Sequence, residues 1–548
     1  MNRADLMHRY GKWSLLFPPL LSAMLVCWDY STPGITADGH TYLQIARNIH
    51  FGIGLGWQAL WAAPLHSMLI ALVGWLPGVA DLQAAAGIAA ALMGVGLTAA
   101  VCFLAHEAGG RHVALAAGCI AAVFPHFRWI ARTTEPEVTY AAFLILALAL
   151  LLAAVRRSSL LLAAATGISF ALAYMGRSEG FLVMLLALGA STALSWLRDH
   201  RLVSVRLAIV VLLFFFAASL PYLLFLKRNY GTWIISPKAT YVLIWMKSRI
   251  YHDNDKGEVD NDELWGLSPN GRLKWQQPSG AGDLLGYLMS HPAKSLQVYL
   301  RNLSLEIPGR IPNNSGMQHY PQVYPILLAL LALFAACRNW GDDSARTKAV
   351  LFSPLLILLI LPVYTEGWWK YLVPYAPLVI IAACIGLSQA SDLLGRRLPR
   401  GTVLFSIGAA GLVLWYWQAH TPPRQPAAVS VVDQGRRSYT QETEKAGRWI
   451  AATLGPRKNY MVRWSKLIYY LNGFWTAEPV ADYFSLLQYA RREGAEYYLR
   501  EVPSNVPAPE LAAATPPGLA FVTLYRAPDT GFSVAVYRFT AQPQTGVN

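Results

Sequence analysis

A series of apolar runs along the first three quarters of the chain restricts its fold more than any other feature. These runs measure about 16 to 23 residues and extend from Trp13 to Gln418, and a helix of that length crosses a hydrocarbon core of roughly 30 Å. Only 14% of the 548 residues are charged, whereas soluble domains usually carry about 25%. The sequence therefore predicts a polytopic membrane protein of the mainly α class.

The chain is basic, with a formal net charge of +14 at pH 7, but its Lys and Arg residues lie at the ends of the apolar runs. A nucleic-acid-binding protein would instead place them in a patch or stripe on one face of a domain, so we exclude this class of partner. The five cysteines fall within apolar runs and show no paired spacing. Neither a disulfide framework nor a zinc site is therefore expected.

The charged connectors decide which runs cross the membrane. A further apolar run at 61–79 is ambiguous. If this run does not cross, the N-terminus and every basic connector face the cytoplasm, as the positive-inside bias requires. We therefore predict an interfacial or re-entrant helix at 61–79, and its flanking tryptophans favour the same placement.

About eleven spans result from hydropathy and charge bias. They are residues 13–29, 83–105, 112–127, 138–155, 159–176, 180–197, 207–226, 324–337, 349–364, 371–390 and 402–419.

Two domains follow from this topology. Residues 1–420 form the predicted transmembrane domain. Residues 421–548 alternate helix-like patterns, such as 442–454, with strand-like runs at 496–499, 520–525 and 533–539. This alternation predicts a small extracytoplasmic α/β domain. We expect a plasma (inner) membrane protein with a cytoplasmic N-terminus and an extracytoplasmic C-terminal domain. The outer loops of the first domain are residues 30–82, 128–137 and 227–323.

Four charged elements face the outer side of the membrane in this topology. Each has an ordinary structural explanation, since an acidic residue can cap a helix, a turn can be solvated, and a lysine can snorkel. Their convergence on one face favours a shared site, in which a carboxylate takes the proton of an acceptor hydroxyl and cations stabilise a departing phosphate. The residues concerned are Asp38, Glu135, Arg177 with Glu179, and Lys370.

Over residues 10–420 the sequence resembles the GT-C superfamily of membrane glycosyltransferases, which includes protein O-mannosyltransferases and the bacterial enzymes that add aminoarabinose or galacturonic acid to lipid A. The segment DGHTYLQIAR at 38–47 resembles the acidic motif of the family's first outer loop. RTTEP at 132–136 resembles the acidic element of its second loop. RSEG at 177–180 and KYLVP at 370–374 resemble later landmarks. The resemblance implies a GT-C type fold for the transmembrane domain.

The resemblance also implies an activity, the inverting transfer of a sugar from a polyprenyl phosphate to a lipid, glycan or protein acceptor. In a bacterium the donor would be carried by undecaprenyl phosphate. Asp38 is then the expected catalytic base and Glu135 the second acidic residue. The expected contacts to the donor phosphate or the substrate are Lys370, Arg132, Arg177, Glu179, His66, His40 and Tyr42. The sequence identifies neither the sugar nor the acceptor.

Three positions depart from the family pattern. Lys370 stands where relatives often have arginine, and a lysine offers a point charge in place of a bidentate fork. Ala63 precedes Pro64 where the lipid A enzymes commonly have lysine before paired prolines, so His66 is the candidate substitute for that lysine. The first-loop motif has one acidic residue, Asp38, in place of the Asp-Glu pair of the mannosyltransferases.

No cofactor is expected. Some relatives require a divalent metal, and Asp38 with His40 or Glu135 offers part of a site. Hard cations usually take more oxygen ligands than these residues supply. We therefore predict no metal site.

Two other functions stay open at this point. A flippase or transporter of lipid-linked sugars would place ionisable groups near span centres and broken helices in corresponding halves, and the sequence shows neither pattern. An O-antigen ligase or polymerase would use Arg and His in the long outer loop, where His291, Arg301 and His319 are the candidates. In the C-terminal domain, aromatic residues such as Trp475 could stack on a sugar, although core packing explains them more often.

Overall fold

The computed structural model describes most of the chain in two compact units. The first unit comprises Met1–Ala239 and Leu288–Gln425, and the second comprises Thr240–Tyr287 and Pro426–Asn548. The predicted domain boundary after residue 420 lies close to this division, and the second unit also includes a part of the predicted long outer loop. The described residues are 14–28, 35, 38–79, 81–199, 202–236, 265–268, 270–275, 288–306, 326–338, 344–360, 369–395, 401–419, 431–463, 465–502, 507–527 and 532–540.

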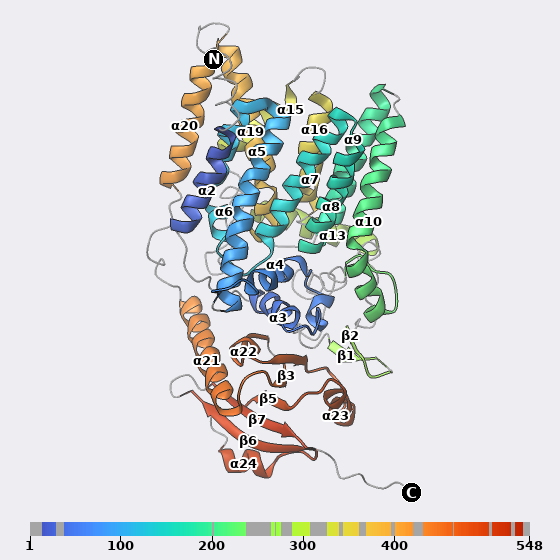
Figure 1. Ribbon diagram of the computed structural model, residues 1–548, viewed down its shortest axis with the longest axis vertical. Coiled ribbons are helices and arrows are strands. Elements are labelled where there is room, and N and C mark those ends of the chain that lie inside the picture. Colours follow the sequence, from blue (N-terminus) through green and yellow to red (C-terminus); the bar gives the residue numbers. More distant parts are fainter. Residues whose placement is uncertain are drawn as a thin grey trace. The chain divides into compact units, whose positions relative to one another are not determined.

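Helices make up the first unit (Figure 1). In chain order they are η1 (Ser14–Leu16), α2 (Phe17–Trp28), α3 (Gly39–His50), η2 (Trp57–Leu60), α4 (Leu65–Gly74), α5 (Leu82–Val123), α6 (Pro125–Ile130), α7 (Glu137–Arg157), α8 (Leu160–Gly176), α9 (Glu179–Asp199), α10 (Leu202–Tyr230), α13 (Pro292–Glu306), α15 (Ile326–Cys337), α16 (Ser344–Phe352), η6 (Ser353–Leu356), α17 (Ile357–Ile360), α18 (Trp369–Leu372), η8 (Val373–Tyr375), α19 (Ala376–Gly395) and α20 (Gly401–Ala419).

Within the described part of the chain, 5 helical stretches are long and apolar enough to cross a membrane. Several shorter apolar helices coincide with other predicted spans. The protein is therefore a multi-pass membrane protein. The predicted number of about eleven spans is not confirmed, because only these 5 of the described stretches meet the length and hydropathy required of a span. The 5 stretches are Leu82–Val123, Glu137–Arg157, Glu179–Leu197, Ser204–Tyr230 and Val373–Leu394.

The element α5 covers the predicted span 83–105 and most of the predicted span 112–127. Its backbone leaves the helical conformation at Gly110, where φ is 81° and ψ is −174°. A positive φ is accessible to glycine because it has no Cβ atom. The chain reverses at this glycine, because a Cβ atom at Gly118 would clash with Cys102 Sγ. The element α5 therefore consists of two helices that meet at Gly110, within the connector between the two predicted spans.

The two ends of α7 have different partners. At its C-terminal end, Arg156 donates a hydrogen bond to Thr347 Oγ1 at 3.1 Å, and Arg157 forms an ion pair with Glu107. The basic connectors around 156–157 and 338–348 therefore lie at the same end of the helix bundle. Glu137 begins α7 and lies at the opposite end. This arrangement agrees with the predicted topology, in which both connectors face one side of the membrane.

The helices α3 and α4 belong to the first predicted outer loop and lie across one end of the helix bundle (Figure 1). The helix α4 has 10 residues, and at 1.5 Å per residue it spans about 15 Å, half of a hydrocarbon core. Its side chains Met68 and Leu72 are exposed, and so is that of Trp75, which directly follows the helix. A short helix with exposed apolar residues fits the predicted interfacial or re-entrant segment at 61–79.

The second unit contains a mixed sheet with the strand order β4-β3-β5-β7-β6. The strand β3 pairs in parallel with β4 and β5, while β7 pairs antiparallel with β5 and β6. The predicted strand-like runs near 497, 520 and 533 are all present, whereas β3, β4 and the hairpin β1–β2 were not predicted. The bounds are β1 (Trp265–Leu267), β2 (Leu273–Trp275), α21 (Val431–Leu454), β3 (Asn459–Val462), α22 (Ser465–Tyr470), β4 (Phe474–Ala477), α23 (Tyr483–Arg492), β5 (Tyr497–Glu501), α24 (Ala508–Ala513), β6 (Leu519–Arg526) and β7 (Ser533–Phe539).

The aromatic residue Trp475 has a structural role in this unit. Its side chain packs against the buried core that includes Tyr460 and Ile468. Its indole nitrogen Nε1 donates a hydrogen bond to the carbonyl oxygen of Val462 at 2.9 Å. These contacts favour core packing over sugar stacking at this residue.

Candidate functional site

The helix α3 carries polar residues into a buried position. His40, Thr41, Gln44, Arg47 and Asn48 are all at most 6% exposed. Burial of a polar side chain costs free energy unless the side chain is paired. A helix with only a structural role at the protein surface would turn such residues toward solvent. The burial of this polar helix therefore marks a candidate site.

Asp38 occupies the N-cap position of α3 and is half-buried. Within the described segment 38–50 its carboxylate makes no capping hydrogen bond to the helix. Asp81 differs, because its Oδ1 accepts a hydrogen bond from the backbone N–H of Ala84 at 2.7 Å at the start of α5. Helix capping therefore accounts for Asp81 and does not account for Asp38.

Arg177 lies at the centre of a buried charge cluster between α8 and α9. Its Nη1 donates to Glu137 Oε1 at 2.5 Å, and its Nη2 donates to Glu179 Oε1 at 3.0 Å. The side chains of Arg177 and Glu137 are 5% and 3% exposed, which excludes a solvated turn at Arg177. The guanidinium also lies 4.6 Å from the ring centroid of Tyr371, in the range of a cation–π contact.

The turn that carries Arg177 approaches its neighbours closely. A Cβ atom at Gly176 would lie 3.2 Å from the Cα atom of Tyr140, and one at Gly180 would lie 2.8 Å from the backbone nitrogen of Tyr174. Larger residues at these positions would push the turn away from α7 and α8. The two glycines therefore allow Arg177 to reach Glu137.

Glu137 is a functional candidate that the sequence analysis did not single out. Its side chain is buried, and its Oε2 atom has no hydrogen-bond partner among the described residues. It lies two residues after Glu135, at the first position of a span. An acidic residue at a membrane boundary usually has a function or a partner. This position in the sequence was as strong an indication for Glu137 as for Glu135.

The environment of Tyr42 shows that the predicted motifs come together. Burial raises the pKa of the Tyr42 hydroxyl well above its ordinary value, the carboxylates of Glu137, Asp38 and Glu135 raise this pKa further, and Arg177 opposes them. Tyr42 therefore stays protonated at neutral pH. Charges from the first outer loop, the second outer loop and the turn after α8 all act on this one hydroxyl group.

His66 is fully buried at the start of α4. Its Nδ1 lies 2.9 Å from Thr139 Oγ1, and burial lowers the pKa of its imidazole to about 4. The ring is therefore neutral at neutral pH. This environment favours a structural role for His66 over the predicted contact to a phosphate.

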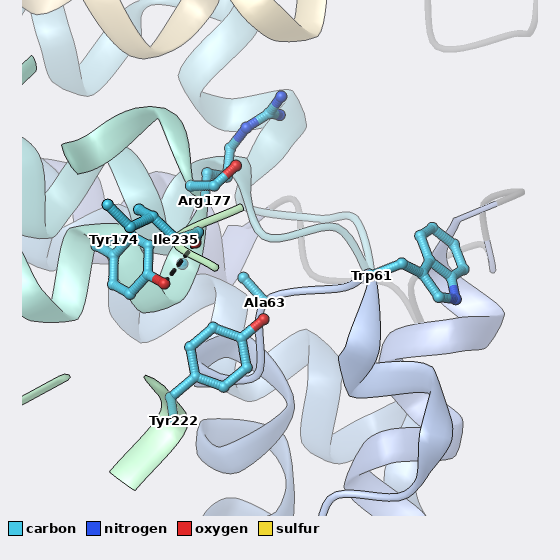
Figure 2. Close-up of a pocket in the computed structure, with 8 residues that line it drawn as sticks. Trp61, Ala63, Tyr174, Arg177, Tyr222 and Ile235 are labelled. Carbon is cyan, nitrogen blue, oxygen red and sulfur yellow. Dashed lines mark hydrogen bonds between the residues drawn. The ribbon is translucent and has the colours of Figure 1, made fainter. Parts of the chain in front are cut away.

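A pocket of about 290 Å³, including the part open to solvent, adjoins the charge cluster. The Tyr174 hydroxyl donates to the carbonyl oxygen of Ile235 at 2.6 Å, and the Tyr222 hydroxyl donates to that of Ala59 at 3.1 Å. Figure 2 shows the guanidinium of Arg177 pointing away from both tyrosine rings, so the arginine contributes its backbone to the pocket. The lining residues are Trp61, Ala63, Tyr174, Gly176, Arg177, Ser178, Tyr222 and Ile235.

The other predicted residues lie as follows. Arg132 is half-buried between α6 and α7, close in sequence to the buried Glu135. The backbone of Lys370 belongs to α18, and its side chain lies outside the described residues, as does His319. His291 directly precedes α13, and Arg301 lies within this helix. Among the described residues, no group of three His, Cys, Asp or Glu side chains is arranged to hold a metal ion.

Comparisons with known proteins identify the fold. No known sequence family and no curated protein sequence matches the chain. The Archaeoglobus fulgidus oligosaccharyltransferase tethered to an acceptor peptide is similar, with a TM-score of 0.54, 13% identity and coverage of 90% of this chain and 69% of that one. ArnT from Cupriavidus metallidurans bound to undecaprenyl phosphate is also similar, with a TM-score of 0.54, 14% identity and coverage of 95% and 97%. Its apo state gives a TM-score of 0.52 at 15% identity and covers 98% of each chain. The chain therefore shares the fold of the oligosaccharyltransferase and of ArnT.

Proposed function

We propose that this protein is an integral-membrane inverting glycosyltransferase. It moves a sugar from a polyprenyl phosphate, undecaprenyl phosphate in a bacterium, to a lipid, glycan or protein acceptor. The buried ion pair of Arg177 with Glu137, and the charges of Asp38, Glu135, Glu137 and Arg177 that all act on the buried hydroxyl of Tyr42, carry this proposal. The GT-C fold supports it, because similar structures contain undecaprenyl phosphate or an acceptor peptide.

In this proposal Asp38 is the general base. Its carboxylate is half-buried and does not cap α3, so it can accept the proton of an acceptor hydroxyl. The acceptor oxygen then attacks the anomeric carbon from the face opposite the phosphate, and the bond between that carbon and the phosphate oxygen breaks. The polyprenyl phosphate leaves with the electron pair, and the configuration at the anomeric carbon inverts. A general base typically contributes 10²- to 10⁴-fold to the rate, as an order of magnitude.

The structure favours different roles for the predicted cations. Arg177 already binds two carboxylates, which favours the positioning of Glu137 and Glu179 over a contact to phosphate. Arg132 and Lys370 are therefore the proposed contacts to the departing phosphate, whose developing charge they would stabilise. Tyr42 stays protonated and can donate a hydrogen bond to the substrate. Glu135 is the second proposed catalytic carboxylate, and His40 belongs to the proposed substrate-binding side of α3.

We propose a plasma (inner) membrane location with the N-terminus in the cytoplasm and the C-terminal domain outside. The shared position of Arg156 and Thr347 at one end of the bundle supports this topology. The acidic residues Glu137 and Glu179 begin their helices at the other end. The active site then faces the extracytoplasmic side.

The proposed activity is tested with the full-length protein in proteoliposomes and a panel of radiolabelled sugars on undecaprenyl phosphate. We expect transfer from at least one monophosphate donor to an acceptor, with inversion at the anomeric carbon. Movement of the donor across the bilayer without transfer would instead identify a flippase. Transfer from diphosphate-linked oligosaccharides alone would identify a ligase or polymerase.

A further inference from the structure

His66 contacts one residue on each of the two helices that follow the predicted acidic residues. On the α7 side, its Nδ1 lies 2.9 Å from Thr139 Oγ1. On the α3 side, its ring meets the Tyr42 ring edge to face, with ring centroids 6.0 Å apart and an interplanar angle of 77°. His66 and Thr139 are both 0% exposed. The histidine therefore lies between α3 and α7 with no surface of its own.

The contacted residues are close to the proposed catalytic groups. Tyr42 follows Asp38, the N-cap of α3, by about one helical turn. Thr139 is the third residue of α7, four positions after Glu135. A displacement of α3 relative to α7 would change the separation of Asp38 from Glu135. His66 is therefore placed to fix that separation.

The hydrogen bond between His66 and Thr139 is not a local helix contact. A threonine inside a helix usually bonds back to the carbonyl group three or four residues earlier, whereas Thr139 reaches a residue 73 positions earlier in the chain. The Nε2 atom of His66 is buried and has no hydrogen-bond partner among the described residues. Nδ1 is thus the ring nitrogen that holds the two segments together.

We propose that His66 is a positioning residue that holds α3 against the start of α7 through Thr139 and Tyr42. This inference rests on the proposed function, because it assigns His66 to the geometry of the transfer site. His66 does not contact the substrate. Its substitution changes the alignment of Asp38 with Glu135, and a misplacement of about 1 Å can lower a rate on the order of 100-fold.

Two amide substitutions separate the two ring nitrogens. The asparagine amide in His66→Asn lies near the position of Nδ1, and the glutamine amide in His66→Gln lies near the position of Nε2. We expect His66→Asn to keep most of the turnover number, while His66→Gln and His66→Ala lose about tenfold or more. The KM for the lipid donor should change much less than kcat. If His66→Gln keeps the wild-type kcat and His66→Asn loses it, the proposal is overturned, because this result would assign the positioning role to Nε2.

Thr139→Val provides the second arm of the test. If the two residues act through one contact, the double variant His66→Ala/Thr139→Val loses no more kcat than the worse single variant. Independent losses that multiply in the double variant would contradict the proposal. A rise in donor KM at constant kcat would also contradict it, since that pattern indicates a binding contact.

Thermal unfolding of the full-length protein in detergent gives a readout that does not depend on activity. The Tm changes of the two single variants should not add in the double variant, because each removes the same hydrogen bond. Additive Tm changes would overturn the proposed link between α4 and α7. If wild-type protein transfers no sugar, the proposed function fails, and this unfolding cycle still decides whether His66 couples the two helices.

Discussion

The helices α3 and α4 of the first outer loop show opposite relations between composition and burial. The helix α3 is rich in polar residues and nearly all of it is buried, whereas the apolar helix α4 exposes Met68 and Leu72. In water the reverse would hold, because apolar surface is buried and polar surface is solvated. The difference indicates that α4 faces hydrocarbon or its interface and that α3 lines a polar site.

The charge cluster beside α3 is the strongest test of this comparison. Arg177→Leu leaves Glu137 buried without its partner, which should destabilise the protein by about 3 to 5 kcal/mol. Arg111→Leu is the matched control in the same unit, since Arg111 is exposed and bonds only to Ser14 among the contacts described. Thermal unfolding in detergent should show a change within about 1 kcal/mol for that control. Equal losses of unfolding free energy in the two variants would contradict the assignment of Arg177 as a buried charge and Arg111 as an exposed one.

The pH dependence of stability tests the burial of His66. Its pKa is lowered from 6.5 to about 4 by burial, so below pH 6.5 the unfolded chain binds a proton that the folded chain does not. The folded state therefore loses stability as the pH falls from 6.5 to 4, by about 3 kcal/mol for a shift of this size. His66→Asn lacks the titrating group. The free energy of unfolding should therefore decline less between pH 6.5 and 4 in the variant than in the wild type. Equal declines in the two proteins would show that His66 is exposed to solvent.

The smallest expected effect is on the exposed face of α4. Leu72→Ala removes a side chain that is 57% exposed, so its change in unfolding free energy in detergent should be within about 0.5 kcal/mol. Ile45→Ala in α3 is the comparison, since Ile45 is 0% exposed and truncation of a buried isoleucine costs about 2 to 5 kcal/mol. A large loss in Leu72→Ala would show that α4 packs against protein.

Much of the fold and part of the site could be predicted from the sequence. Apolar runs and basic connectors predicted the membrane helices, because hydropathy and charge bias act locally along the chain. The same topology brought Asp38, Glu135 and Arg177 to one face, and the charges of all three act on the pKa of Tyr42. The predicted number of spans is not confirmed, since several predicted spans coincide with apolar helices of only 10–17 residues, such as Ile326–Cys337.

The rest of the site depends on contacts between distant segments. The sequence offered helix capping as an explanation for Asp38, but which acidic residue caps depends on the side-chain geometry at the helix start. Glu137 binds Arg177 40 positions later in the chain, and His66 bonds to Thr139 across 73 positions. Helix packing sets these pairs, and a single sequence carries no direct record of it. The charge cluster therefore became visible only in three dimensions.

The transfer rate of Asp38→Asn, measured beside Asp81→Asn, tests the central claim most directly. Both aspartates precede helices, but Asp81 caps α5 and Asp38 leaves α3 without a side-chain cap. We predict that Asp38→Asn lowers sugar transfer from undecaprenyl phosphate by about 100-fold or more, with little change in Tm, while Asp81→Asn transfers at nearly the wild-type rate. Wild-type transfer by Asp38→Asn would contradict the account, because no carboxylate would then be needed where α3 begins.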